Sequence, residues 1–369
     1  MAQAVRAQDP QVDVQCVDAL EYTRRWFHAF YAQTYLFLVR YVPWVWRVSY
    51  ALLDWEPVYR MVQPIRRRWN LWISRPFAAW LQQTQPDLIV TTHFLPADVA
   101  SALKAAGWLT SRLVVVVTDL YPHRFWTSSN TDAVVVATPE GRRVLIQRGV
   151  PSERVHVLGI PIAPAFSAAM DREALRGRWQ LAPRRRTVLV TSGGTTVGQF
   201  ERVVETLVAL EAVLPQRLQL LIVCGEDERA RRRLSKRAAS SPVPMRVFGF
   251  VDHMAELMAA SDVIVAKAGG LTVSEALGRG VPLILYHVIP GQERLNAEHV
   301  ARHGAGLIAR RPRDVAQIVR RLMERPEQLA RMEEAAWALS RPDAASAIVS
   351  QIVGPLLRPG DISILPSDD

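Results

Sequence analysis

The sequence predicts an α/β protein built from two doubly wound halves, and three observations support that fold class. From residue 87 onward, short apolar runs of strand length alternate with helix-compatible stretches. The alternation restarts after a basic, proline-bearing connector at residues 183–186. With 369 residues the chain is also longer than a single hydrophobic core usually grows, so two domains are expected.

The first half contains four predicted strands, each an apolar run typical of a buried parallel strand. They are DLIVTTH (87–93), LVVVVTDL (113–120), AVVVAT (133–138) and VHVLGIP (155–161). Helix-compatible stretches separate them at residues 97–106 and 139–148, and Gly149 and Pro151 stop the second helix. We expect this domain to span residues 1–170.

The second half repeats the pattern with five further runs. They are TVLVTSGG (187–194), LQLLIVCG (218–225), MRVFGFV (245–251), VIVAKAG (263–269) and PLILYHV (282–288). Helical spacing continues through residues 313–350. We expect a second domain over residues 184–340, a C-terminal helix over 341–355 and a loose tail over 356–369.

Composition and charge narrow the classes of function. Apolar residues make up 49% of the chain and its formal charge is +10, so a folded protein with an anionic partner is expected. Cys16 and Cys224 lie far apart, which excludes a disulfide framework and indicates a reducing cytosol. The opening residues lack a signal-peptide pattern, and the apolar stretch at 26–39 is too short to span a bilayer.

Ligands of open parallel sheets bind beyond the carboxyl ends of the strands, and two glycine-rich loops lie at such ends. The first, SGGTTVG, contains Gly193 and Gly194, which let the backbone approach a phosphate. A plain tight turn is the equally weighted alternative. The second, KAGGLTVSE, starts at Lys267 and leads into a helix whose amino end favours a diphosphate.

Glu275 in the second loop allows two interpretations. Thr272 and Glu275 have the spacing of a capping box, in which the glutamate only returns a hydrogen bond to the backbone. The carboxylate could equally accept both hydroxyls of a ribose. The next strand ends in IPGQE and leads into a helix that carries Asn296, so three polar loops converge on one crevice.

The stretch KAGGLTVSEALGRGVPLILYHVIPGQERLNAEHV resembles the donor-site signature of the monogalactosyldiacylglycerol synthase and diacylglycerol glucosyltransferase family. VVVVTDLYPHRFW, ATPEGRRVLIQRGVPSERVHVLGIPIAPAF and TSGG are similar to family blocks in the same order. The resemblance implies a GT-B fold, with two Rossmann-like domains facing across a cleft. It also implies inverting transfer of galactose or glucose from the UDP-sugar to diacylglycerol.

The resemblance assigns the donor site residue by residue. The backbone at Phe250 and Val251 is expected to face uracil, Glu275 the ribose, Gly270, Leu271 and Thr272 the diphosphate, and Gln292 and Glu293 the sugar hydroxyls. Gly193, Gly194, Lys267, Gly269 and Asn296 complete the predicted nucleotide-sugar site.

The implied chemistry is a single displacement without a metal or other cofactor. No D-x-D motif lies at the end of a predicted strand, and residues 226–228 are interpreted as a solvated acidic loop. Asp119 and His93, both at strand ends, are the candidate catalytic bases. For His93 a hydrogen-bonded structural role is equally open.

Relatives in this family usually begin with a strand and a loop of the type G-G-G-H-x-x-A, whose histidine is a favoured base. This sequence starts after that loop, so we expect the first strand to be missing, through a late start assignment or a natural truncation. Residues 1–5 are then expected to be helical, and VDVQCVDA (12–19) to form the second strand.

The amino half also carries a predicted acceptor and membrane side. His123 and Trp126 match a family H-x-x-W pattern, with loop packing as the alternative. Trp44 and Trp46 belong to a stretch rich in Trp, Tyr and Arg, which favours an anionic membrane surface over a merely packed flank. No RNP, KH or helix-turn-helix pattern supports nucleic-acid binding. We expect a peripheral, monotopic enzyme on the cytoplasmic face of a membrane.

Two other functions remain open at this point. One is transfer of N-acetylglucosamine to another lipid acceptor, since Gln292 and Glu293 would meet sugar hydroxyls in either case. The other is a non-catalytic protein that binds a UDP-sugar and a membrane, which the missing glycine-rich loop suggests.

Overall fold

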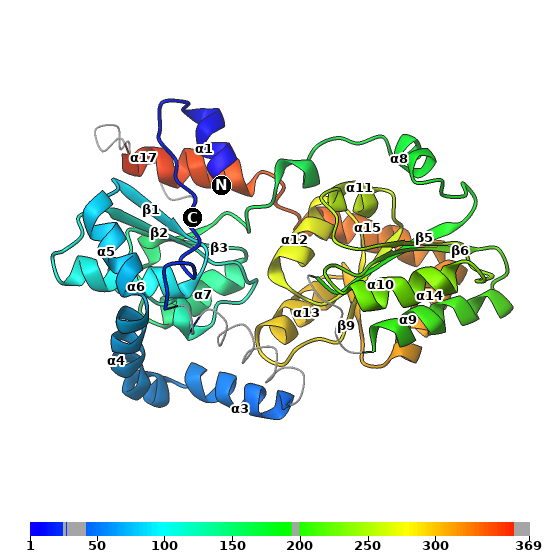
Figure 1. The fold of residues 1–369 in the computed structure, drawn as a ribbon, viewed down its shortest axis with the longest axis horizontal. Coiled ribbons are helices and arrows are strands. Elements are labelled where there is room, and N and C mark those ends of the chain that lie inside the picture. Colours follow the sequence, from blue (N-terminus) through cyan, green and yellow to red (C-terminus); the bar gives the residue numbers. More distant parts are fainter. Residues whose placement is uncertain (25–26, 28–41, 194–198, 358–369) are drawn as a thin grey trace. The chain divides into compact units, whose positions relative to one another are not determined.

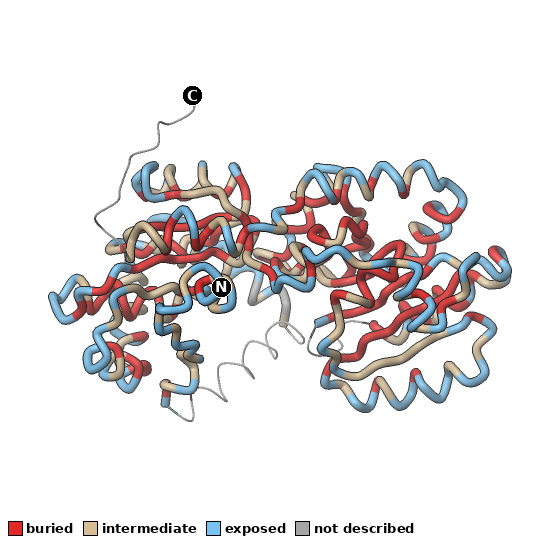
Figure 2. The backbone as a smooth tube through the Cα atoms, turned by 90° about the horizontal axis from the view of Figure 1, so that it is seen from above, coloured by how far each residue is buried: buried red, intermediate tan, exposed pale blue. Residues whose placement is uncertain are grey.

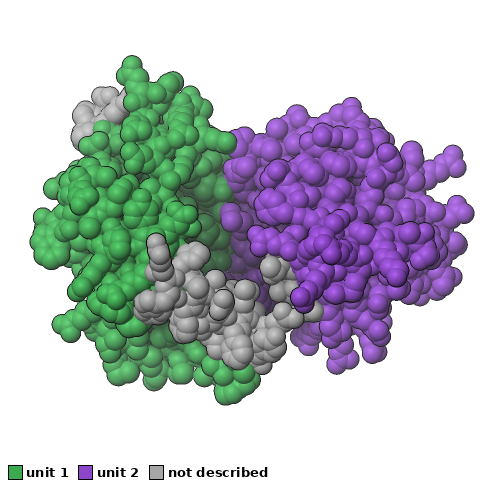
Figure 3. Space-filling model, viewed as in Figure 1, with its two compact units in different colours: residues 1–161, 343–369 green, residues 162–342 purple. Residues whose placement is uncertain are grey.

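A computed structural model describes residues 1–24, 27, 42–193 and 199–357, which form two compact units (Figures 1 and 3). Unit 1 comprises Met1–Pro161 and Asp343–Asp369, and unit 2 comprises Ile162–Pro342. Each unit is built on a parallel sheet with helices around it, so the predicted α/β class is confirmed. Burial is concentrated on the strands of both sheets (Figure 2).

The sheet of unit 1 contains the four strands that the sequence predicts. They are β1 (Leu88–Thr91), β2 (Arg112–Val116), β3 (Ala133–Val136) and β4 (Val155–Val157), parallel and in the order β1-β2-β3-β4. The segments that connect them contain α6 (Phe94–Ala105), the 3₁₀ turns η1 (Arg124–Trp126) and η2 (Ser152–Arg154), and α7 (Pro139–Gln147). Each strand is shorter than its apolar run, because the run continues into the loop that follows.

Both faces of this sheet are covered, which explains why its strands are apolar without alternation. Leu113 and Val115 belong to one cluster, together with side chains of α5 (Arg75–Thr84) and α6. Val114 and Val116 belong to the other, together with α1 (Ala2–Gln8) and the C-terminal segment. That segment consists of α16 (Ala344–Ile348), the π-turn η5 (Val349–Val353) and α17 (Gly354–Leu357). It therefore returns to unit 1, where α16 and η5 pack against α1 (Figure 1).

The strand predicted over residues 12–19 is wrong, whereas the helix predicted at the amino end is confirmed as α1. Val12 and Val14 pack against the cluster on the α1 side of the sheet, and Val17 and Ala19 pack against the opposite cluster. The apolar side chains of this segment are thus partly buried, by packing against the two clusters. Among the described residues, this segment forms no ladder of backbone hydrogen bonds with a strand.

An arm of two helices, α3 (Pro43–Asp54) and α4 (Glu56–Ile73), precedes α5 and extends away from the sheet (Figure 1). A buried carboxylate on α6 holds α4: Arg66 Nη1 lies 2.9 Å from Asp98 Oδ2, and Asn70 Nδ2 donates to the same oxygen at 3.0 Å. None of the described helices is both long enough and apolar enough to cross a membrane.

Unit 2 contains six parallel strands, of which the sequence predicts five. They are β5 (Arg186–Thr191), β6 (Leu218–Val223), β7 (Met245–Phe248), β8 (Val263–Ala266), β9 (Leu283–Tyr286) and β10 (Gly306–Ala309). Its helices are α8 (Arg172–Arg178), α9 (Phe200–Val208), α10 (Glu228–Ala238), α11 (Met254–Ala259), α12 (Gly270–Gly278), α13 (Gln292–Arg302), α14 (Pro312–Glu324) and α15 (Pro326–Leu339), with the 3₁₀ turns η3 (Pro164–Phe166) and η4 (Ala209–Ala212). The missed strand, β10, is a short edge strand that begins with glycine and is only partly buried.

The order of strands in unit 2 fixes where a ligand should bind. The order is β7-β6-β5-β8-β9-β10, which is 3-2-1-4-5-6 when the strands are numbered within the unit. The chain runs outward from β5 through β6 to β7 and then crosses back to β8 on the other side of β5. In doubly wound sheets the ligand crevice lies at this change of direction, beyond the carboxyl ends of the strands.

Candidate functional site

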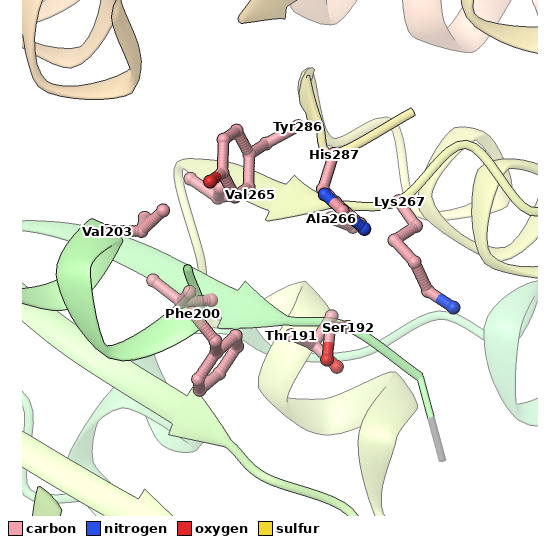
Figure 4. Close-up of a pocket in the computed structure, with 10 residues that line it drawn as sticks. Thr191, Ser192, Phe200, Val203, Val265, Ala266, Lys267, Tyr286 and His287 are labelled. Carbon is pink, nitrogen blue, oxygen red and sulfur yellow. The ribbon is translucent and has the colours of Figure 1, made fainter. Parts of the chain in front are cut away.

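A pocket in unit 2 lies at the carboxyl ends of β5, β8 and β9, beside the change of direction between β5 and β8 (Figure 4). It is lined by Val190, Thr191, Ser192, Phe200, Val203, Val265, Ala266, Lys267, Tyr286 and His287. Most of its wall is apolar, and the polar groups lie at the last residue of a strand or directly after it. A small-molecule site is expected to have this composition.

The loop after β5 brings its backbone close to Lys267. Gly193 has φ +84°, a conformation that favours glycine, and its amide donates to Thr191 Oγ1 at 3.5 Å. A Cβ at Gly193 would lie 3.9 Å from Lys267 Nζ, so the ammonium lies beside this loop. Gly194, which the sequence analysis also selects, lies outside the described residues.

The start of α12 presents backbone amides on the same side of the sheet. Gly269 is the N-cap and offers no side chain to the amides of Gly270, Leu271 and Thr272. A Cβ at Gly269 would meet no atom within 4 Å, so the approach to these amides is open. Lys267 forms no ion pair with any residue that the structure describes. Amides, helix dipole and ammonium together suit a diphosphate.

Glu275 is free of the capping role that its spacing with Thr272 suggested. The helix begins at Gly270, so Thr272 is already its third residue and cannot be the N-cap. The capping-box alternative is therefore wrong. The side chain of Glu275 makes no hydrogen bond or ion pair within the described parts of the chain, and burial raises its pKa to about 7. A half-buried carboxylate that accepts no hydrogen bond from the described residues can accept hydrogen bonds from the hydroxyl groups of a ligand.

The loop before α13 is braced by two of the residues assigned to the donor. Glu293 Oε2 accepts from the Ile289 amide at 3.0 Å, and Asn296 Nδ2 donates to the Ala268 carbonyl at 3.0 Å. The buried Gln292 Oε1 has no hydrogen-bond partner among the described residues. Glu293 and Asn296 thus connect the loops around the pocket, while the Gln292 carbonyl is available to a ligand donor.

Phe250 and Val251 follow β7, at the opposite edge of the sheet from β10, and neither lines the pocket. The Phe250 side chain is 71% exposed, which is unusual for a large apolar residue in a folded unit. An exposed backbone and ring beyond a strand end are compatible with a planar base, and the role of both residues stays a prediction.

The two histidines selected in the amino half have the hydrogen bonds of structural histidines. His93 caps α6, with its Nδ1 accepting from the Leu95 amide at 3.2 Å, and burial lowers its pKa to about 4. His123 Nδ1 accepts from the Phe125 amide at 3.1 Å, and its pKa is likewise lowered to about 4, mainly by burial. This pattern assigns the proton to Nε2 in both rings, so neither offers a free lone pair for base catalysis.

Asp119 lies near the end of β2, and His93 lies near the end of the neighbouring strand β1. The two strand ends are connected by Thr118 Oγ1, which lies 3.5 Å from the Thr92 carbonyl. Asp119 is half-buried, and its negative charge adds to burial in raising the pKa of Tyr50. The structure therefore brings the two predicted bases to the carboxyl ends of neighbouring strands, and the catalytic role of both stays a prediction.

The predicted acceptor-side residues divide into a buried and an exposed group. His123 and Trp126 are 6% and 4% exposed, in the η1 segment that anchors α3. Asp54, at the end of α3, accepts from the Arg124 amide at 2.9 Å and from Arg148 Nη2 at 2.7 Å. Trp44 on α3 is 64% exposed. The side chain of Trp46 lies outside the part that the structure describes.

His287 is a pocket residue that the sequence analysis missed. It directly follows β9 with φ +52°, a left-handed conformation that a non-glycine residue rarely adopts and that often marks functional sites. Burial and the Lys267 ammonium both lower its pKa. Its position at the end of the apolar run PLILYHV is the sequence signal for it.

Family comparisons agree with this division into units. Residues 1–162 match the family model of monogalactosyldiacylglycerol (MGDG) synthase, and residues 187–348 match the C-terminal domain of glycosyltransferase family 28. A processive diacylglycerol beta-glucosyltransferase of Bacillus cytotoxicus is 31% identical over 276 residues, which are 74% of this chain and 69% of that protein. One of Bacillus cereus strain AH187 is 30% identical over 274 residues, with the same coverage.

Solved structures with the same fold include Acinetobacter baumannii MurG, with a TM-score of 0.58 and 18% identity over 77% of this chain and 78% of that one. S. aureus MnaA with UDP has a TM-score of 0.63 and 17% identity over 79% and 81%. Anabaena Alr3699/HepE with UDP has a TM-score of 0.53 and 19% identity over 76% and 82%. The GT-B fold is thereby confirmed, and the sequence matches show that the chain belongs to the family of diacylglycerol-glycosylating glycosyltransferases.

Proposed function

We propose that the protein transfers a hexose from UDP-glucose or UDP-galactose to diacylglycerol, with inversion at the anomeric carbon. The observation that carries the proposal is the pocket of unit 2, which Lys267 lines, and the segment that follows Lys267 along the chain, with the open start of α12 and the side chain of Glu275. These groups match a diphosphate and a ribose in the order in which a nucleotide sugar presents them.

UDP is supported as the carrier by structures of the same fold whose titles include it, MnaA with UDP and HepE with UDP-glucose. Diacylglycerol is supported as the acceptor by the names of the sequence relatives. The Gln292 carbonyl, buried and without a partner among the described residues, would accept a hydrogen bond from a sugar hydroxyl. We assign the neighbouring Glu293 to the same sugar, with one oxygen kept on the Ile289 amide.

In the proposed reaction the acceptor hydroxyl oxygen attacks C1 of the sugar, and the bond from C1 to the β-phosphate oxygen breaks. Asp119 would take the hydroxyl proton, since its carboxylate lies near a strand end while the Nδ1 lone pair of His93 accepts from the Leu95 amide. Lys267 and the amides of α12 would stabilise the negative charge on the departing UDP. This assignment of roles uses no metal.

We further propose that the protein works on the cytoplasmic face of an anionic membrane, which it contacts through the α3–α4 arm. Large apolar side chains are exposed along this arm: Trp44, Val48, Leu52, Trp55, Met61, Ile65 and Trp69. Arg47 and Arg68 are exposed beside them and make no ion pair within the described residues. An apolar surface flanked by arginines suits a bilayer with anionic headgroups.

Membrane contact is tested by sedimentation with liposomes that contain or lack anionic lipid. The double variant Trp44→Ser, Trp55→Ser should bind anionic vesicles at least about tenfold more weakly, because two exposed rings leave the interface. Trp108→Ser is the matched control, since Trp108 is 62% exposed in unit 1 but lies outside the arm. Equal loss in both variants, or equal binding to neutral vesicles, would refute the assignment.

Transfer itself is tested with radiolabelled UDP-glucose, UDP-galactose and UDP-N-acetylglucosamine, diacylglycerol in anionic liposomes and EDTA. Transfer of glucose or galactose supports the proposal, and Asp119→Asn should abolish it while UDP still binds. Transfer of N-acetylglucosamine alone would favour the alternative donor. UDP binding without transfer from any donor would favour a non-catalytic protein.

A further inference from the structure

His287 lies where β9 enters the donor pocket, opposite the loop that follows β5 (Figure 4). Its left-handed backbone conformation turns the chain at the strand end and directs the imidazole into the pocket beside Lys267. The side chain is half-buried and makes no hydrogen bond within the described part of the chain. It is thus a titratable group without a hydrogen-bond partner among the described residues, next to the position proposed for the diphosphate.

The empty pocket favours the neutral form of this imidazole. Burial lowers its pKa, and so does the ammonium of Lys267 from β8. Tyr286 on β9 has its ring 6.2 Å away, and Glu293 on α13 is engaged with the Ile289 amide. The groups that β5 and α9 contribute to the pocket are uncharged: Thr191, Ser192, Phe200 and Val203.

We propose that His287 contacts the diphosphate of the donor and binds it as an imidazolium, so that donor binding takes up a proton. This inference rests on the proposed function, because it assumes that a nucleotide sugar occupies the pocket. Two phosphate charges beside the ring outweigh the single opposing charge of Lys267 and favour the protonated form. His287 would then add a second cation to the site only when the donor is present.

The test is calorimetric titration of the whole chain with UDP-glucose near neutral pH, in buffers of different ionisation enthalpy. Both phosphates of UDP-glucose are esterified and do not titrate near pH 7, so any protons taken up on binding are released by the buffer and bound by groups of the protein. Uridine is titrated in parallel, because it offers the ribose to Glu275 without a diphosphate. The difference between the two ligands isolates the protonation linked to the phosphates.

The informative variant is His287→Asn, because asparagine tolerates the left-handed conformation. Wild type should take up at least about half a proton more with UDP-glucose than with uridine. In the variant, proton uptake should be the same with the two ligands. Its affinity for UDP-glucose should be roughly tenfold below that of wild type near pH 6 and should approach it as the pH rises. His303→Asn, which changes an exposed histidine after α13, should behave as wild type.

Equal proton uptake by wild type and His287→Asn would overturn the inference and leave the proposed function intact. Failure of UDP-glucose to bind at any pH would contradict the proposed function and this inference together. Thermal unfolding of His287→Asn is measured alongside. A transition that matches that of wild type shows that a loss of proton uptake does not arise from misfolding.

Discussion

Replacing Glu275 with glutamine should stabilise the empty protein and weaken the donor site at the same time. In the folded chain burial raises the pKa of this carboxyl from 4.5 to about 7. Below about pH 4.5 the group is neutral in both states, and the folded protein has no penalty. As the pH rises through about 7 the group must ionise in a half-buried position, so stability is lost. Glutamine has no proton to lose and avoids this cost.

The magnitude follows from the two pKa values. A difference of about 2.5 corresponds to about 3.4 kcal/mol at 1.36 kcal/mol for each pKa unit. Because Glu275 is only half-buried, solvent screening reduces the expected gain to roughly 1–2 kcal/mol at pH 8. For a unit of this size the gain corresponds to a rise of about 2–8 °C in the transition temperature. Near pH 4.5 the two proteins should unfold alike.

The assay is thermal unfolding of the empty protein at both pH values, following the transition that UDP shifts, because a chain of two units need not unfold in one step. Calorimetry with uridine should show an affinity about 100-fold lower in Glu275→Gln, if two hydrogen bonds to a charged acceptor contribute about 1.5 kcal/mol each. Glu334→Gln, at an exposed position of α15, is the control and should change neither quantity. A lower transition temperature at pH 8, or unchanged uridine binding, would refute this account of Glu275.

Three further predictions concern the site and its supports. Lys267→Met should weaken UDP-glucose binding by about 10- to 100-fold through loss of a charge-assisted contact, while calorimetry with uridine shows no change. Gly280→Ala should destabilise unit 2 by about 2–4 kcal/mol in chemical unfolding. The residue has φ +65°, and an added Cβ would overlap the Trp337 ring. Replacing Trp337 with alanine as well should restore only part of the lost stability, because the backbone strain remains. Asp54→Ala leaves the buried Arg148 guanidinium unpaired and should cost about 3 kcal/mol, with limited proteolysis showing faster cleavage within α3.

The strands of the sheets could be predicted because their signal is local. A buried parallel strand must be apolar on both faces, so residues such as 113–117 form a continuous apolar run that needs no partner to be recognised. The prediction of a strand over 12–19 was wrong because it depended on the same local signal. Its apolar residues indicate contact with the core. Packing against the two clusters provides that contact without pairing to a neighbouring strand.

The roles of single polar side chains could be predicted only as alternatives. Thr272 and Glu275 have the spacing of a capping box whether or not a helix starts between them, and the start of α12 at Gly270 decides the question. His93 has the position of a base, but the hydrogen bond from the Leu95 amide to its Nδ1 appears only once the α6 cap is built. Protonation and partners depend on neighbours that spacing does not reveal.

The sequence by itself determined the two α/β units, the glycine-rich loops at their strand ends and the family, because apolar runs and contiguous motifs are encoded locally. Only the tertiary structure decided the strand order that makes the end of β5 and β8 the ligand crevice, and the return of Ile348 and Ile352 to cover the sheet of unit 1. It also placed His287 beside Lys267. Each of these contacts joins residues from different elements, brought together by burial of the sheet faces rather than by any local pattern.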